Sequence, residues 1–179
     1  MRGKLLKFFS AASVICIVFF ITALACRNLF PDSFSSYIDH YCRKYGVSPS
    51  LVYALIKAES NFREDARSSA GAKGLMQITD ETFEYCLKTL GIPNANIFNA
   101  EANIQCGIWY LSYLLGKYGG NTKNAVAAYN AGETNVNRWL KDSRYSKDFK
   151  TLLRIPFGET KRHVEKIQRY AKIYEYIYF

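Results

Sequence analysis

One glutamate stands where the sequence could support acid–base chemistry. It ends an apolar helix face whose members recur at steps of three and four: Val52, Leu55, Ile56 and Glu59. A carboxylate on such a face loses hydration, and the negative C-terminal end of a helix opposes its charge. Both effects favour the protonated acid, the form that can donate a proton to the bridging oxygen of a glycosidic bond. The spacing alone also fits an exposed helix-end glutamate, or a carboxylate paired with lysine or arginine.

The elements that must position Glu59 are predicted to be helices. Ser48-Pro49 is a helix start signal, because the hydroxyl can cap a free N–H and proline suits the first helical position. Residues 61–79 are rich in Ser, Ala and Gly, which predicts tight turns or a short irregular hairpin. Asp80 is expected to cap the next helix. The full set is predicted over about 34–45, 49–60, 80–90, 104–118, 122–131 and from just after Pro156 to the end.

Several separated segments of the sequence resemble a known protein family, and the helical spacing of apolar residues alone does not reveal this resemblance. They are AES at 58–60, GAKGLMQI at 71–78, AAYNAG at 127–132 and PFGET at 156–160, with a further likeness around Asn103 to Leu111. In this order, across roughly residues 34 to 178, they resemble the soluble lytic transglycosylases, relatives of goose-type lysozyme. The resemblance implies a mainly α, lysozyme-like domain with a short irregular β-turn segment, acting on peptidoglycan glycan strands.

The resemblance also implies roles for six residues. Glu59 matches the catalytic glutamate, and five positions match the lining of the glycan groove: Ser68, Gln77, Tyr129, Asn130 and Glu159. Gln77 can bind an N-acetyl group, and Tyr129 can orient the reacting sugar or the acid. Without the resemblance, four of them would be taken for other roles: Ser68 as a turn residue, Gln77 as a surface amide, Tyr129 as a core aromatic and Glu159 as a helix cap.

The number of carboxylates bears on the mechanism. Ordinary glycosidases use two, whereas the resemblance carries over only Glu59. It implies that Glu59 protonates the oxygen between N-acetylmuramic acid and N-acetylglucosamine, and then removes a proton from the muramic acid 6-hydroxyl as that oxygen attacks C1. The product ends in a 1,6-anhydro sugar. No metal or other cofactor is implied.

Two other functions stay open. In a hydrolytic, lysozyme-like muramidase, Asp65 or Glu64 would position water as the second carboxylate. A non-catalytic scaffold would only bind peptidoglycan, but binding needs no desolvated acid, so Glu59 argues against it. The net charge of +9 suits any polyanion. Nucleic acid is not expected as a partner, because no zinc-finger spacing, aromatic-basic strand motif or basic heptad helix is present.

Residues 1–30 are predicted to form a signal or membrane anchor, and residues 31–179 the catalytic domain. The run Phe8–Cys26 carries no charge and follows three basic residues, and its length suits a span of ~20 residues. The positive-inside rule then predicts a single-pass protein of the cell membrane with its domain outside the cytoplasm. Ala23-Leu24-Ala25 also resembles a cleavage site before Cys26, so a lipoprotein and a secreted form stay open.

The cysteines do not predict a disulfide framework. The sequence has five, and three of them, Cys42, Cys86 and Cys106, fall in the domain. An odd number without metal-ligand spacing favours small buried apolar residues, although one disulfide with a leftover thiol stays open.

Overall fold

The computed structural model describes residues 14, 16–18, 20, 21, 24 and 26–179. The chain divides into a unit that ends at Ser33 and a unit from Phe34 to Phe179. Among the described residues, no helix combines the length and the apolar character that a membrane crossing needs. Much of the run Phe8–Cys26, on which the membrane helix is predicted, lies outside the described residues.

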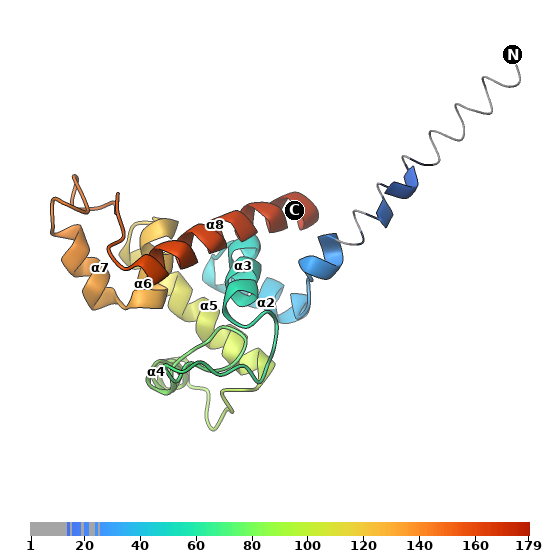
Figure 1. Cartoon of the computed structure of the whole chain (residues 1–179). Helices are drawn as coiled ribbons and strands as arrows, with labels where there is room; N and C mark the ends of the chain where they lie inside the picture. Colours follow the sequence, from blue (N-terminus) through green and yellow to red (C-terminus); the bar gives the residue numbers. More distant parts are fainter. Residues whose placement is uncertain (1–13, 15, 19, 22–23, 25) are drawn as a thin grey trace, which may run out of the picture. The chain divides into compact units, whose positions relative to one another are not determined.

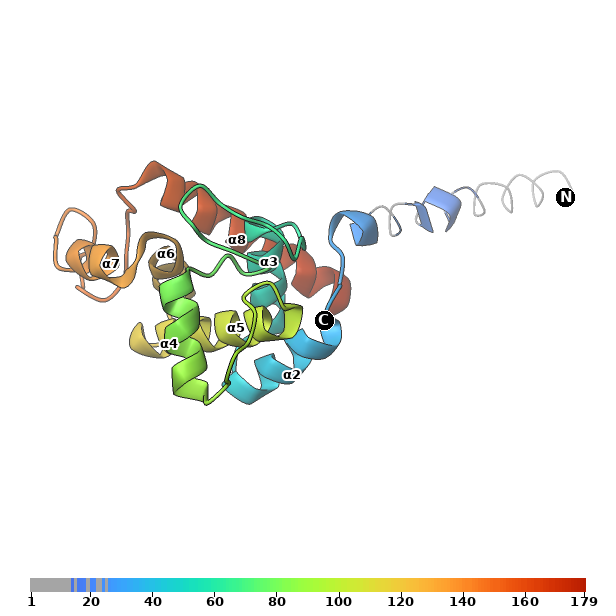
Figure 2. The same cartoon turned by 90° about the horizontal axis from the view of Figure 1, so that it is seen from below.

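The second unit is helical, as predicted (Figure 1). Its elements are α2 (Ser35–Tyr45), α3 (Pro49–Glu59), α4 (Asp80–Leu90), α5 (Ala100–Lys117), α6 (Thr122–Ala131), α7 (Glu133–Leu140) and α8 (Gly158–Tyr178). The long helix α5 contacts α2, α4 and α6, and Figure 2 shows it running between them. On the other side, α8 packs along α3 and also contacts α6. The helix α7 was not among the predicted elements.

The predicted apolar face of α3 forms part of the core. Val52, Leu55 and Ile56 are fully buried, and the adjoining α8 buries Val164 and Ile167. Burying a side chain of this kind contributes roughly 1.5–3 kcal/mol. The packing of α3 on α8 therefore fixes the end of α3, where Glu59 stands.

One predicted helix cap, Asp80, is wrong, and another, Ser48, is confirmed in position but not in its side-chain hydrogen bond. The hydroxyl of Thr79, not the side chain of Asp80, accepts a hydrogen bond from the Thr82 N–H at 3.3 Å. Asp80 is instead the first residue of α4, and its carboxylate pairs with Lys73 at 2.6 Å. Ser48 is the N-cap residue of α3, as predicted, but its side chain makes no capping hydrogen bond, and its hydroxyl lies 2.7 Å from that of Ser50. Pro49 does occupy the first turn of α3, as predicted.

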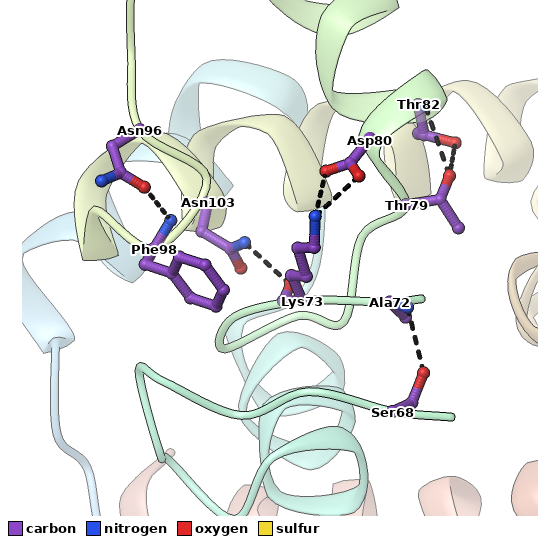
Figure 3. Close-up of polar contacts among 9 residues, drawn as sticks. All are labelled: Ser68, Ala72, Lys73, Thr79, Asp80, Thr82, Asn96, Phe98 and Asn103. Carbon is purple, nitrogen blue, oxygen red and sulfur yellow. Dashed lines mark hydrogen bonds and ion pairs between the residues drawn. The ribbon is translucent and has the colours of Figure 1, made fainter. Parts of the chain in front are cut away.

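The segment between α3 and α4 is the predicted irregular hairpin. Its pairing consists of two isolated antiparallel bridges, Arg67 with Lys73 and Lys73 with Ile78. Asn103 on α5 holds this loop: its amide nitrogen donates to Lys73 O at 3.1 Å, and its oxygen accepts from the Met76 N–H at 2.8 Å. Figure 3 shows Asn103 beside the loop that carries Lys73. A buried asparagine thus fixes the loop backbone to the central helix.

Gly74 is needed for this packing. Its φ is +78°, and a Cβ there would lie 2.7 Å from Cγ of Asn103. Only a residue without a Cβ fits there, so glycine at this position permits the close approach of the loop to the Asn103 side chain. The three cysteines of the domain are buried and free, as favoured from the sequence.

Candidate active site

Glu59 is the last residue of α3, at the end of the buried face. Its side chain is 15% exposed, and its Oε1 lies 3.1 Å from Nε2 of His163 on α8. His163 was not predicted as a site residue. The sequence held one signal for it, because His163 follows Glu159 by four residues and therefore lies on the same face of α8.

The surroundings of Glu59 also contain lysines from two helices. Lys166 of α8 donates to the carbonyl oxygen of Ala58 at 3.3 Å, which satisfies an acceptor in the last turn of α3. Lys57 donates to the side-chain oxygen of Asn61, and burial together with Lys166 lowers the pKa of Lys57. These cations offset the negative end of the α3 dipole.

Tyr129 on α6 lies close enough to Glu59 to be influenced by its charge. Burial, and then the nearby Glu59 carboxylate, hold the pKa of Tyr129 well above its usual range. The phenol therefore stays protonated, and it donates to the carbonyl oxygen of Met76 at 2.9 Å. This hydrogen bond joins α6 to the loop that precedes α4.

Gln77 follows Met76 in the same loop, with a φ of +49°. Its amide nitrogen donates to Gly74 O at 2.9 Å and to Ala66 O at 3.1 Å. Both amide hydrogens are therefore used to hold the loop. The side-chain oxygen is the part of Gln77 that remains to accept a hydrogen bond from a substrate N–H.

The other three predicted groove residues are exposed. The Ser68 hydroxyl accepts from the Ala72 N–H at 3.0 Å and so closes a turn (Figure 3). Asn130 adjoins Tyr129 near the end of α6, and Glu159 lies in the first turn of α8. Within the described part of the chain, no hydrogen bond or ion pair joins any of the three to Glu59. The structure thus gathers His163 and Tyr129 around Glu59, with Gln77 linked through the loop.

The two carboxylates weighed for a hydrolytic mechanism lie in the turn after α3. Glu64 and Asp65 are both exposed. Neither forms an ion pair or a side-chain hydrogen bond in the portion of the molecule that the structure describes. Glu59, by contrast, is largely buried, so its environment differs from that of both.

The helical domain thus places one largely buried acid, Glu59, beside a turn-rich loop. The chain matches the model of the Transglycosylase SLT domain over residues 36–152 and belongs to this family. Among curated relatives, it is 33% identical over 152 residues to the soluble lytic murein transglycosylase of Salmonella typhimurium, covering 82% of this chain and 24% of the relative. A membrane-bound lytic murein transglycosylase C of Yersinia enterocolitica is 31% identical, covering 73% of this chain and 43% of the relative.

Solved structures of lytic transglycosylases agree with this family assignment. The lytic transglycosylase Slt of Pseudomonas aeruginosa, an inactive mutant with glutamine in place of a glutamate, is 36% identical with a TM-score of 0.73, over 82% of this chain and 24% of that one. The 70 kDa soluble lytic transglycosylase of Escherichia coli is 29% identical with a TM-score of 0.75, over 84% and 25%. The lysozyme-like fold implied by the resemblance is confirmed. This chain spans only about a quarter of the length of the soluble relatives.

Proposed function

We propose that this protein is a peptidoglycan lytic transglycosylase and that Glu59 is its single catalytic acid and base. The observation that carries the proposal is the placement of Glu59, 15% exposed at the end of α3 and beside Tyr129 and His163. Family membership and the names of the relatives support the substrate class. The solved relative that is described as inactive with a glutamate changed to glutamine supports the role of an acid.

The proposed reaction proceeds in two proton transfers. Glu59 gives its proton to the oxygen that bridges N-acetylmuramic acid and N-acetylglucosamine, and the bond from that oxygen to C1 breaks. The resulting carboxylate takes the proton of the muramic acid 6-hydroxyl as its oxygen bonds to C1. The attack is intramolecular, and well-oriented intramolecular reactions reach effective molarities of ~10⁵ M or more. Glu59 regains its proton as the 6-hydroxyl attacks C1, so one carboxyl serves as the acid in the first step and as the base in the second.

The groove is proposed to run past the loop and the start of α8. Gln77 would accept a hydrogen bond from a sugar N-acetyl N–H through its side-chain oxygen, since its nitrogen is already bound. Tyr129 would keep the loop beside Glu59 through its bond to Met76 O. Ser68, Asn130 and Glu159 are exposed and able to meet the more distant parts of a glycan strand.

The hydrolytic alternative needs a second carboxylate that positions water. Glu64 and Asp65 are exposed and are held by no ion pair among the described residues, so neither is fixed for that task. A scaffold that only binds peptidoglycan needs no enclosed acid, so the burial of Glu59 argues against this alternative.

We also propose that residues 1–30 attach the protein to the cell membrane and that the domain of residues 31–179 works outside the cytoplasm. The uncharged run Phe8–Cys26 and the basic residues before it support this. The full chain should sediment with membranes and resist release by salt, whereas a protein starting at Pro31 should be soluble. Release of the full chain by salt alone would contradict the anchor.

Product analysis tests the proposed reaction. The domain of residues 31–179 is incubated with purified peptidoglycan, and the released muropeptides are weighed by mass spectrometry before and after borohydride reduction. A lytic transglycosylase releases products one water lighter than hydrolysis products and without a reducible end. Reducible muramic acid ends would identify hydrolysis, and binding without release would identify a scaffold.

A further inference from the structure

The two proton transfers proposed for Glu59 do not involve His163, although the two side chains are in contact. Nε2 of His163 lies 3.1 Å from Oε1 of Glu59, and the imidazole is 13% exposed. That nitrogen is buried, and no acceptor stands in line with it at hydrogen-bonding geometry. Buried polar atoms are rarely left without an aligned partner, because this costs about 1–3 kcal/mol. Catalytic hydrogen bonds are often poorly aligned in the free enzyme and tighten when substrate binds.

The other polar side chains near Glu59 form hydrogen bonds elsewhere, so the contact with the Glu59 carboxyl is made by His163. From α6, the Tyr129 hydroxyl is bound to Met76 O at 2.9 Å. On α8 itself, Lys166 is bound to Ala58 O at 3.3 Å. From α3, Lys57 is bound to Asn61. In the region that the structure covers, no other hydrogen bond or ion pair holds the Glu59 carboxyl.

We propose that His163 is a positioning residue that holds Oε1 of Glu59 and thereby directs the other carboxyl oxygen to the glycosidic bond. The inference rests on the proposed function, because it assigns a task within that reaction. A glutamate side chain has several rotamers, and misplacing a catalytic group by about 1 Å can cost ~10²-fold in rate. An anchor on one oxygen removes that freedom.

The anchor also matters between the two proton transfers. After Glu59 has given its proton to the bridging oxygen, a carboxylate stands in a largely enclosed place. An N–H of His163 directed at Oε1 stabilises that charge until the 6-hydroxyl proton arrives. His163 keeps its own proton throughout, so the proton count of the reaction does not change.

Kinetics on a soluble glycan substrate test the inference with the domain of residues 31–179. His163→Phe keeps a ring of similar size but removes the nitrogen, and we expect kcat to fall about 10- to 100-fold with little change in KM. His163→Gln places an amide N–H near the position of Nε2 and should restore most of kcat. His40, an exposed histidine on α2, provides the control, and His40→Gln should behave like the wild type.

A spectroscopic comparison adds a readout that does not need turnover. The chain has only two histidines, so ¹⁵N imidazole signals can be assigned with His40→Gln. Changing Glu59→Gln should shift the signals of His163 and leave those of His40 in place. Unmoved His163 signals, wild-type kcat in His163→Phe, or a loss that His163→Gln does not restore would overturn the inference. A wild type that yields no anhydro product would instead overturn the proposed function, and the inference with it.

Discussion

The hydroxyl of Tyr129 donates to the carbonyl oxygen of Met76 at 2.9 Å, so α6 and the loop before α4 hold each other beside Glu59. The two residues are 53 positions apart in sequence. The loop therefore takes its place from two helices, through Tyr129 on α6 and Asn103 on α5.

Tyr129→Phe tests whether the hydrogen bond from Tyr129 to Met76 O, and not only the packing of the ring, holds the loop in place. The ring is kept, but Met76 O loses its donor, and the free energy of unfolding should fall by about 1–2 kcal/mol. Turnover should fall as well, because the loop that carries Gln77 is no longer fixed. Urea unfolding and product release measure the two effects. Tyr176→Phe is the control, since that side chain is 92% exposed, and equal behaviour of the two variants would contradict the anchor.

Two glycines of α5 provide a matched pair. A Cβ at Gly107 would lie 2.8 Å from Cβ of the fully buried Met76, whereas a Cβ at Gly116 meets nothing within 4 Å. Gly107→Ala should therefore destabilise the domain by roughly 1–3 kcal/mol, because the core must shift. Gly116→Ala should stabilise it by about 0.5–1 kcal/mol, since alanine is the better helix former.

Thermal or urea unfolding of both glycine variants checks this pair. A Gly107→Ala protein as stable as the wild type would show that the loop and α5 are not in close contact. A destabilised Gly116→Ala protein would show that residue 116 is not open to solvent.

Stability should decline in alkali. Burial, with Asp39 adding to it, raises the pKa of Cys42 from 9.0 to about 12, and burial followed by Glu133 raises the pKa of Tyr110 from 10.0 to about 12. The folded state thus keeps protons that the unfolded chain loses. These contributions are fully present below pH 9 for Cys42 and below pH 10 for Tyr110, and each is lost as pH rises toward 12.

Urea unfolding at pH 8, 9, 10 and 11 measures this decline. Cys42→Ala removes one of the two groups, so its stability should fall less steeply than that of the wild type from pH 9 upward. Tyr110→Phe should show the same difference from pH 10 upward. A wild-type free energy of unfolding that stays constant from pH 8 to pH 11 would contradict the assignment.

Local patterns were sufficient for most of the helical frame. The three- and four-residue steps through Val52, Leu55 and Ile56 predicted the buried face of α3, because helical periodicity is encoded within a few residues. The helix α7 was missed, since Gly132 both ends α6 and precedes the first residue of α7 without a side-chain cap. The side chains of Ser48 and Asp80 do not make the predicted capping hydrogen bonds, because each has another partner, Ser50 and Lys73 respectively.

The site was less accessible from sequence. Glu59 could be placed at the end of an apolar face, but its contact with His163 joins residues on α3 and α8. Pairings of this kind depend on how helices pack, which no local pattern encodes. The amide of Gln77 illustrates the same limit, because the sequence does not show that the two hydrogen bonds from its nitrogen to the loop leave its oxygen as the end available to a sugar.

The central claim is that Glu59 supplies the proton. Glu59→Gln keeps the size of the side chain and much of its hydrogen bonding but cannot transfer a proton, so release of 1,6-anhydromuropeptides from purified peptidoglycan should fall by at least ~10²-fold. Unfolding and peptidoglycan binding measured on the same preparation should match the wild type. A folded Glu59→Gln protein that releases anhydromuropeptides at the wild-type rate would contradict the account.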